Sequence, residues 1–498
     1  MKRNVFCGTV LFSLFLLRAD FAIAARPNIL FIVCDDLSTL GVGCYGNPIV
    51  KTPNMDRLAA RGVRFERAYC QWPLCLPSRN SFLSGRRPDG RFTGGGLLRE
   101  RVPDVTFMPE YFRKNGYFTA RGGKLFHCRT IFNGGGDLED PACWDVSEKG
   151  GIPGDPCGYA VHFSSIPKGL AAHPELQPLV LDQELLNKAG VPAYDYWMEM
   201  AALKDGADTV DANVARRISQ LLDERAKKVE EKPFFIAAGF RRPHLLWVAP
   251  EQCFKMYDPK SIELPKEPAN DLDDIPKPAL TRGAPNMTDD QRRQAIAAYY
   301  ACVTHVDKQL GVLLDAMDRN KLWDNTIIVF TADHGWHLDN HGLWGKVSLF
   351  QESAKVPLVI IAPGVTPAKA TCPRTVEMLD FYPTLAELAG LRPPEKVDGV
   401  SIAPLLKDPQ APRDRPAYSV LRRGKLWGRG VYTEAFRYTE WGDEGSKGVE
   451  LYDLKNDPRE FVNLDKDPAH QADLALLKKL LDLTRNLRDT DPPAATGD

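Results

Sequence analysis

The sequence lacks an excess of charge of either sign. Its 498 residues include 64 Lys and Arg against 65 Asp and Glu, which gives a formal net charge of -1. A chain without a positive excess has no general electrostatic attraction for nucleic acid or for an acidic membrane. The 44% of hydrophobic residues also excludes a disordered or fibrous chain. Any attraction for an anion must therefore be local.

Long hydrophobic runs are absent after the first residues. The apolar run at 5–17 follows Lys2 and Arg3, and it is shorter than the roughly 20 residues that span a bilayer. Ala22-Ile-Ala24 then supplies a small-residue cleavage site, so we interpret 1–24 as a secretory signal peptide. We expect an exported protein, periplasmic or extracellular rather than lysosomal, with no stable membrane insertion and no nucleic-acid partner.

Paired cysteines of the Cys-x-x-Cys type are also absent among the eleven cysteines. This absence argues against a zinc ribbon or a thioredoxin motif. Cys143 and Cys157 flank a loop rich in Gly and Pro, and an oxidising compartment would allow them to form a disulfide. Cys34 lies in an apolar run and is expected in the core.

The sequence does contain short apolar runs that alternate with helical patterns. The runs are 28–33, 117–120, 233–238, 326–330 and 357–361, and the predicted helices include 55–61, 208–228 and 291–317. This alternation predicts an α/β fold in which a mixed, mostly parallel sheet is flanked by helices. Polar, Pro-rich stretches at about 145–195 and 257–285 predict loops.

A Pro-rich stretch at 406–416 predicts a boundary near the C-terminus. Short antiparallel strands are expected in 418–438 and an amphipathic helix in 469–487. We therefore predict a large domain at 25–408 and a smaller C-terminal α+β subdomain at 409–498.

Polar residues follow four of the predicted strands. They are Asp35-Asp36, Lys124 with His127, His244, and Asp333-His334 with Lys346. In an open α/β sheet, ligands bind beyond the carboxyl ends of the strands. Each residue alone is more often a cap, a turn residue or a solvated side chain, but together they predict a site. The carboxylates suit Ca²⁺ or Mg²⁺, and Arg79, Lys124 and Lys346 suit a small tetrahedral oxyanion.

A cysteine motif lies between the first two of these groups in the sequence. The segment Pro73-Leu-Cys75-Leu-Pro77-Ser-Arg79 contains Cys-x-Pro-x-Arg ahead of a helical stretch that Gly85 closes. Alone it would read as a buried cysteine before a helix. Together with the acids, Lys124-Leu-Phe-His127, Arg242-Pro-His244 and the string from Asp333 to Lys346, it resembles the signature of formylglycine-dependent type I sulfatases. Glu450-Leu-Tyr-Asp-Leu extends this resemblance to the C-terminal segment.

Within that family the sequence is most similar to the iduronate-2-sulfatase branch. The continuation Arg86-Arg-Pro-Asp89 and the Lys-x-x-His spacing support this assignment. Asp339-Asn340 and Arg241-Arg242 depart from the branch, which has Gly-Glu and His-Lys there. The departures leave the reaction intact and put the exact sugar in doubt.

The resemblance implies an alkaline-phosphatase-like fold and a defined reaction. A maturation enzyme would oxidise Cys75 to formylglycine, whose hydrated form would attack sulfur and later release sulfate. One Ca²⁺ ion would be held by residues matching Asp35, Asp36, Asp333 and His334, together with the converted Cys75. The family's catalytic residues match Cys75, Arg79, Lys124, His127, His244 and Lys346.

Individual roles follow from the same match. His127 is the candidate base, His244 the candidate proton donor to the leaving oxygen, and Lys124 would hold the sulfate. Lys346 would also face the leaving oxygen, and Arg79 would orient the formylglycine. Trp336 is the best candidate to stack on a sugar, while for His337, Trp344 and Arg241 a packing or solvated role is favoured.

The resemblance favours a sulfated saccharide as substrate, with a 2-O-sulfated uronate as the sulfated unit. One alternative is a phosphonate or phosphate ester hydrolase of the same superfamily, although a second set of metal ligands is not found at matching spacing. Another is a catalytically silent glycan-binding protein, which would result if Cys75 stayed unmodified.

Overall fold

The structure is a computed structural model. It describes residues 26–88, 90–94, 96–129, 136–137, 139–148, 176–178, 200–203, 205–206, 209–228, 232–245, 247–280, 287–392 and 394–486. The interpreted signal peptide at 1–24 lies outside these residues, as does Cys157, the predicted disulfide partner of the buried Cys143. In the part of the chain that is described, no helix has the length and apolar character that crossing a membrane requires.

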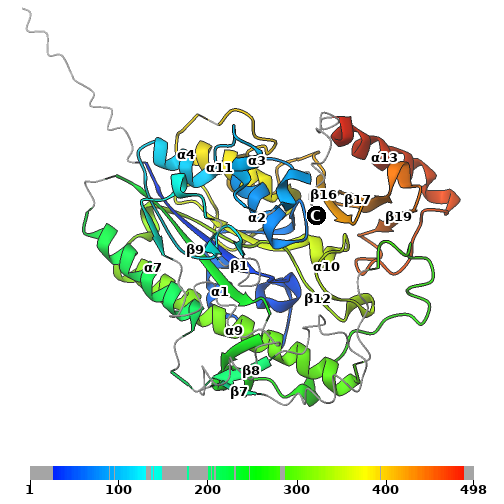
Figure 1. Ribbon diagram of the computed structural model, residues 1–498, viewed down its shortest axis with the longest axis horizontal. Coiled ribbons are helices and arrows are strands. Elements are labelled where there is room, and N and C mark those ends of the chain that lie inside the picture. Colours follow the sequence, from blue (N-terminus) through cyan, green and yellow to red (C-terminus); the bar gives the residue numbers. More distant parts are fainter. Residues whose placement is uncertain are drawn as a thin grey trace, which may run out of the picture.

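An eight-stranded sheet lies at the centre of the molecule (Figure 1). In spatial order its strands are β15 (Ala370–Glu377), β2 (Val63–Tyr69), β14 (Lys355–Ile361), β11 (Thr326–Ala332), β1 (Asn28–Asp35), β9 (Phe234–Pro243), β3 (Phe118–Gly123) and β6 (Val146–Glu148). Among these strands β14 runs against the direction that the others share. The predicted mixed, mostly parallel sheet is confirmed, and each of the five predicted apolar runs lies in or overlaps one of its strands.

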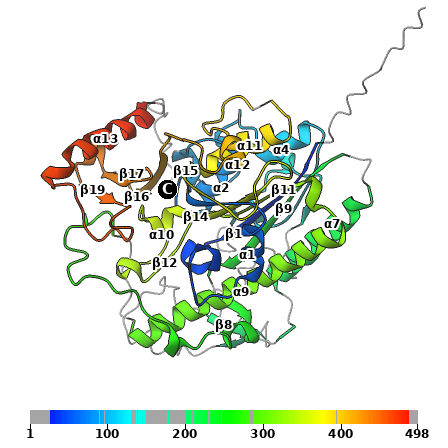
Figure 2. The same ribbon diagram turned by 180° about the vertical axis from the view of Figure 1, so that it is seen from behind.

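Helices cover both faces of this sheet (Figures 1 and 2). One face carries α1 (Pro53–Ala59), α7 (Val210–Ala226) and α9 (Asp289–Arg319), and the other carries α2 (Cys75–Ser84), α4 (Met108–Lys114) and α11 (Phe381–Leu388). The ring of Phe31 on β1 lies 5.9 Å from Phe82 of α2 and 6.1 Å from Phe381 of α11, measured between ring centroids. Because both faces are covered, β1 is buried from Ile29 to Asp35.

The C-terminal region forms a separate four-stranded antiparallel sheet, coloured orange to red in Figure 1. It consists of β16 (Ala417–Arg423), β17 (Leu426–Tyr432), β18 (Phe436–Trp441) and β19 (Gly448–Asp453). Leu477 and Leu481 of α13 (Gln471–Asn486) are buried against it, as the amphipathic pattern predicted. The domain boundary at 408/409 stays a prediction; it falls between α12 (Ala403–Lys407) and β16.

The remaining elements are short. They are α3 (Leu98–Arg101), α8 (Glu251–Phe254), α10 (Gln351–Ala354), β4 (Cys128–Arg129), β5 (Gly136–Asp137), β7 (Leu176–Pro178), β8 (Met200–Leu203), β10 (Trp247–Pro250), β12 (His337–Leu338) and β13 (Trp344–Gly345). The predicted loop at about 145–195 lies largely outside the described residues. The described part of the loop at 257–285 is irregular apart from the 3-10 turn Pro259–Ser261.

Candidate active site

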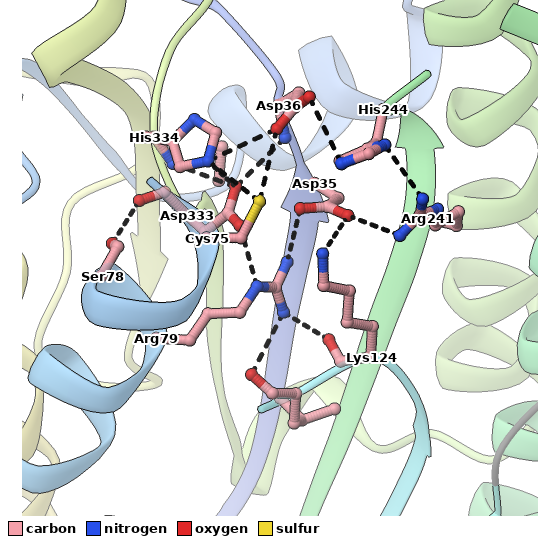
Figure 3. A network of polar contacts seen from close by, with 12 residues as sticks. Asp35, Asp36, Cys75, Ser78, Arg79, Lys124, Arg241, His244, Asp333 and His334 are labelled. Carbon is pink, nitrogen blue, oxygen red and sulfur yellow. Dashed lines mark hydrogen bonds and ion pairs between the residues drawn. The ribbon is translucent and has the colours of Figure 1, made fainter. Parts of the chain in front are cut away.

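The predicted site residues gather at one edge of the large sheet, where its parallel strands end (Figure 3). Asp35 is the last residue of β1, and the ammonium of Lys124, which follows β3, lies 2.5 Å from its Oδ2 atom. The pairing of β1 with β9 shifts register between Cys34 and Asp35, so the strand ends in an irregularity that directs Asp35 and Asp36 into the site. The hydroxyl of Tyr299 on α9 donates to the carbonyl of Asp36 and thereby holds this turn.

Cys75 is the first residue of α2 and is 2% exposed. Its Sγ atom lies 2.9 Å from the Lys346 ammonium, 3.3 Å from Nε2 of His334 and 3.8 Å from Oδ1 of Asp36. Pro77 fits the first turn of the helix because the amide hydrogens there have no partner within the helix. Ser78 donates to the carbonyl of Asp333, which ties the start of α2 to the end of β11.

Arg79 connects two of the carboxylates. Its buried guanidinium lies 2.8 Å from Oδ2 of Asp333 through Nε and 3.3 Å from Oδ1 of Asp35 through Nη2. It also donates to the carbonyl of Leu125 at 3.1 Å. A planar group with several fixed donors is well suited to hold neighbouring acids in one geometry.

The three acids differ in their electrostatic surroundings. Burial raises the pKa of Asp35, but Lys124, His244 and Arg79 outweigh it and hold this pKa well below the usual range. Burial raises the pKa of Asp36 above its usual value despite Lys346. Within the described residues Oδ2 of Asp36 accepts no hydrogen bond, and the residue has a left-handed φ of 63°. A buried, unsatisfied carboxylate oxygen on a strained residue is typical of a ligand-binding position.

This donor set fits a divalent cation. The candidate ligand atoms of Asp35, Cys75, Asp333 and His334 lie within 4.8 Å of one another, and so do those of Asp35, Asp36, Cys75 and His244. The carboxylates offer the oxygen ligands that a hard cation such as Ca²⁺ prefers. The unsatisfied Oδ2 atom of Asp36 is consistent with this fit.

Lys346 lies between the acids and an aromatic ring. Its ammonium is 2.6 Å from Oδ1 of Asp36 and 5.6 Å from the centroid of the Trp336 ring. Trp336 is 1% exposed, and its ring packs against Trp247 at 6.5 Å. The predicted contact of Trp336 with a sugar stays a prediction; in this structure the ring supports Lys346.

Two histidines are held in the neutral form. Burial and then Lys124 lower the pKa of His127 well below its usual value, and Nδ1 of this residue has no partner among the described residues. Burial and then Arg241 lower the pKa of His244 in the same way. Nε2 of His244 lies 3.9 Å from Oδ2 of Asp36. His127, a neutral imidazole with an available nitrogen, is able to accept a proton near pH 7.

Sequence reasoning missed the role of Arg241 in this cluster. The residue is 2% exposed, and its Nη1 atom lies 3.4 Å from Oδ2 of Asp35 while Nη2 lies 3.0 Å from Nδ1 of His244. It stands near the carboxyl end of β9, so the rule that selected the other residues would also have selected it. The buried Asp211, which accepts from its backbone, had no such signal.

A further cluster of acidic residues and a histidine lies outside this site. Glu267, Asp271 and His341 also approach one another closely enough to hold a metal ion. However, His341 is 3.0 Å from Asp271. Burial lowers the pKa of the histidine, but this hydrogen bond together with the nearby carboxylates raises it to about 9. Arg459 pairs with Glu267 at 2.7 Å. This cluster therefore balances its own charge.

Comparison with known proteins identifies the family. The family model described as Sulfatase matches residues 27–391, and the chain belongs to this family of sulfuric ester hydrolases. A model of the C-terminal part of N-sulphoglucosamine sulphohydrolase matches residues 339–486.

Individual relatives cover most of the chain. A sulfatase from Formosa agariphila is 31% identical over 94% of this chain and 88% of its own length. The iduronate 2-sulfatase of Mus musculus is 29% identical over 89% of this chain and 91% of its own.

Two solved structures support the alkaline-phosphatase-like fold. A protein in complex with its substrate D-glucosamine-2-N,6-O-disulfate superposes with a TM-score of 0.69 at 23% identity, covering 94% of this chain and 99% of that one. The phosphonate monoester hydrolase of Agrobacterium radiobacter gives a TM-score of 0.65 at 24% identity, covering 93% and 96%.

Proposed function

We propose that this protein removes sulfate from a sulfated saccharide and that a 2-O-sulfated uronate is the unit it acts on. The surroundings of Cys75 carry this proposal, because three carboxylates, two histidines and several cations converge on its side chain. The similarity to iduronate 2-sulfatase and the fold shared with a glucosamine disulfate complex support a saccharide.

The charge of the site suits a sulfate ester. Four cationic side chains, Arg79, Lys124, Arg241 and Lys346, face the three carboxylates of Asp35, Asp36 and Asp333. The fixed charges therefore sum to about +1 within a protein of net charge -1. A sulfate monoester is a poor electrophile because its oxygens are anionic, so local positive charge is needed.

In this proposal Asp35, Asp36, Asp333 and His334, with residue 75, hold one Ca²⁺ ion. Bound there, the ion would neutralise charge on a sulfate oxygen. Lys124 holds the sulfate group, and Arg79 keeps Asp35 and Asp333 in place through the contacts described above.

The nucleophile is proposed to be formylglycine rather than the thiol. Burial raises the pKa of the Cys75 thiol to about 12, so little of the reactive thiolate exists near neutral pH. Conversion by a formylglycine-generating maturation enzyme would supply a hydroxyl nucleophile from the hydrated aldehyde. His127, which is neutral, accepts the proton of a hydroxyl of the hydrated aldehyde. His244 and Lys346 face the leaving oxygen. We also propose export to the periplasm or the medium, on the basis of the segment 1–24.

Mass spectrometry of the peptide that contains Cys75, from protein produced with a maturation enzyme, tests the nucleophile. We expect an aldehyde in place of the thiol. The same preparation is then assayed on disaccharides sulfated at the uronate 2-O, the glucosamine 6-O or the glucosamine N position, with a phosphonate monoester beside them. Release of sulfate from the 2-O position is expected. Faster hydrolysis of the phosphonate would favour the alternative hydrolase, and an unmodified thiol with saccharide binding but no release would favour the silent glycan-binding protein.

A further inference from the structure

Arg241 lies between Asp35 and His244 (Figure 3). Its Nη1 atom is 3.4 Å from Oδ2 of Asp35, and its Nη2 atom is 3.0 Å from Nδ1 of His244. Nδ1 of His244 also lies 2.6 Å from the carbonyl of Leu245. A guanidinium only donates and a carbonyl only accepts, so Nδ1 forms one of these two hydrogen bonds at a time. When Nδ1 accepts from Arg241, Nη2 also donates to the carbonyl of Leu245 at 3.3 Å, and Nε2 carries the hydrogen and faces Asp36.

Asp211 at the start of α7 fixes the backbone that carries Arg241. Its carboxylate accepts hydrogen bonds from the amides of Arg241 at 2.5 Å and of Arg242 at 3.2 Å. Asp211 is 2% exposed and Arg241 is also 2% exposed, so neither group exchanges these contacts for water. A guanidinium built on such a support has a defined direction toward both Asp35 and His244.

We propose that Arg241, supported by Asp211, is a positioning residue that holds His244 with Nε2 directed at the leaving oxygen. The inference rests on the proposed function, in which His244 assists departure of a sugar alcohol. A sugar alkoxide is far more basic than a phenolate, so its departure depends more on a correctly placed hydrogen-bond donor, which the Nε2–H group of neutral His244 supplies when Nδ1 accepts from the Arg241 guanidinium. Loss of Arg241 should therefore act selectively on substrates with a basic leaving group.

The test compares two substrates in one preparation at saturating Ca²⁺. These are the 2-O-sulfated uronate disaccharide and 4-nitrophenyl sulfate, whose phenolate leaves without much assistance. We expect Arg241→Met to lower kcat on the disaccharide by about 10- to 100-fold, somewhat less than the complete loss of one donor to a developing charge, and on the aryl sulfate by less than about 3-fold. Arg241→Lys should give a partial effect, because a single ammonium cannot serve both partners, and Asp211→Asn a smaller effect in the same direction.

The ratio of the two activities keeps the test decisive if a variant folds poorly, because it does not depend on the folded fraction. Arg216→Gln, at an exposed position of α7, is the matched control and should leave the ratio unchanged. If Arg241→Met leaves the ratio of the two activities unchanged, whether or not both activities fall, the positioning role is overturned while the proposed function stands. If the wild-type protein with formylglycine at position 75 cleaves neither substrate, the proposed function itself fails.

Discussion

Two buried charge clusters of the described chain, one around Arg437 and one around Cys75, differ in how completely their polar atoms are paired. In the C-terminal region, Arg437 pairs with Glu460 and lies 3.1 Å from Glu450 and 2.8 Å from the hydroxyl of Thr439. The second oxygens of these glutamates accept from Trp441 at 2.7 Å and from the amide of Gln351 at 2.9 Å. Each charged atom of this cluster thus has a partner within the protein.

The cluster around Cys75 leaves groups unsatisfied. Oδ2 of Asp36 and Nδ1 of His127 have no hydrogen-bond partner in the described chain, and Asp36 is held in a left-handed conformation. The side chains of Lys346 and His244 keep 16% and 17% exposure, whereas that of Arg437 has none. Unsatisfied buried polar groups lower stability, so they persist where a ligand completes them. The contrast separates a structural ion network from a site.

The sharpest test of this contrast is Cys75→Ala. Removing the nucleophile should lower kcat/KM by at least about 10⁴-fold, since no group that can attack sulfur remains at this position. Cys70→Ala, a second buried cysteine near the end of β2, is the control and should retain turnover. Both rates are measured by sulfate release, and normal turnover of Cys75→Ala would end the assignment of the site.

Arg437→Met should produce the opposite pattern. Breaking a buried ion pair leaves uncompensated charge, here on Glu450 and Glu460, and costs about 3–5 kcal/mol of unfolding free energy. We expect kcat per folded molecule to change by less than about 2-fold. Denaturant unfolding and active-site titration measure the two quantities, with Arg422→Met, an exposed arginine of β16, as control. A variant that is stable but inactive would show that the two clusters are not separate.

Removal of metal should affect the cluster around Cys75 alone. Dialysis against a chelator is expected to lower turnover by about 100-fold and to lower the thermal midpoint, because a cation bound to the folded state stabilises it. Adding Ca²⁺ should restore both, and Arg437→Met should show the same dependence as the wild type. Full activity in protein shown to be metal-free by elemental analysis would refute the proposed ion.

The pH dependence gives the smallest effect. Burial, followed by Lys124, lowers the pKa of His127, the proposed base, well below the usual range. A base is active in its neutral form, so activity should persist as pH falls through 6.5 and decline at lower pH, by about tenfold per unit. We expect a bell-shaped profile of kcat/KM whose acid limb lies below pH 6.5. A flat profile, or an acid limb above pH 7, would contradict the proposed base.

Much of the large sheet could be predicted because buried parallel strands form continuous apolar runs. The direction of β14 could not, since a strand buried on both faces shows the same run whichever way it lies. β2 was missed although the first four residues of Val63–Tyr69 alternate between apolar and charged side chains; the alternation breaks at Arg67. That alternation indicates a strand even though its partly exposed positions carry charged residues.

For the site, the sequence identified residues at strand ends and in one motif, and the structure brings them together. What it could not show depends on tertiary contacts. Arg241 was expected to be solvated, because nothing in the local sequence reveals that Asp35 and His244 lie beside it. Nor could the sequence show that Trp336 is buried beneath Lys346, since a Gly-rich segment alone does not reveal which ring faces solvent.

If Cys75 is converted as proposed, its burial sets an order of events during biosynthesis. With 2% of its surface exposed and its sulfur enclosed by Lys346, His334 and Asp36, the folded protein presents no thiol that another enzyme could grasp. An enzyme that oxidises this residue must therefore meet the chain while α2 is still undocked. Under the proposed mechanism, a molecule that folds before that encounter stays inactive. The yield of active protein therefore depends on the rate of oxidation relative to the rate of folding.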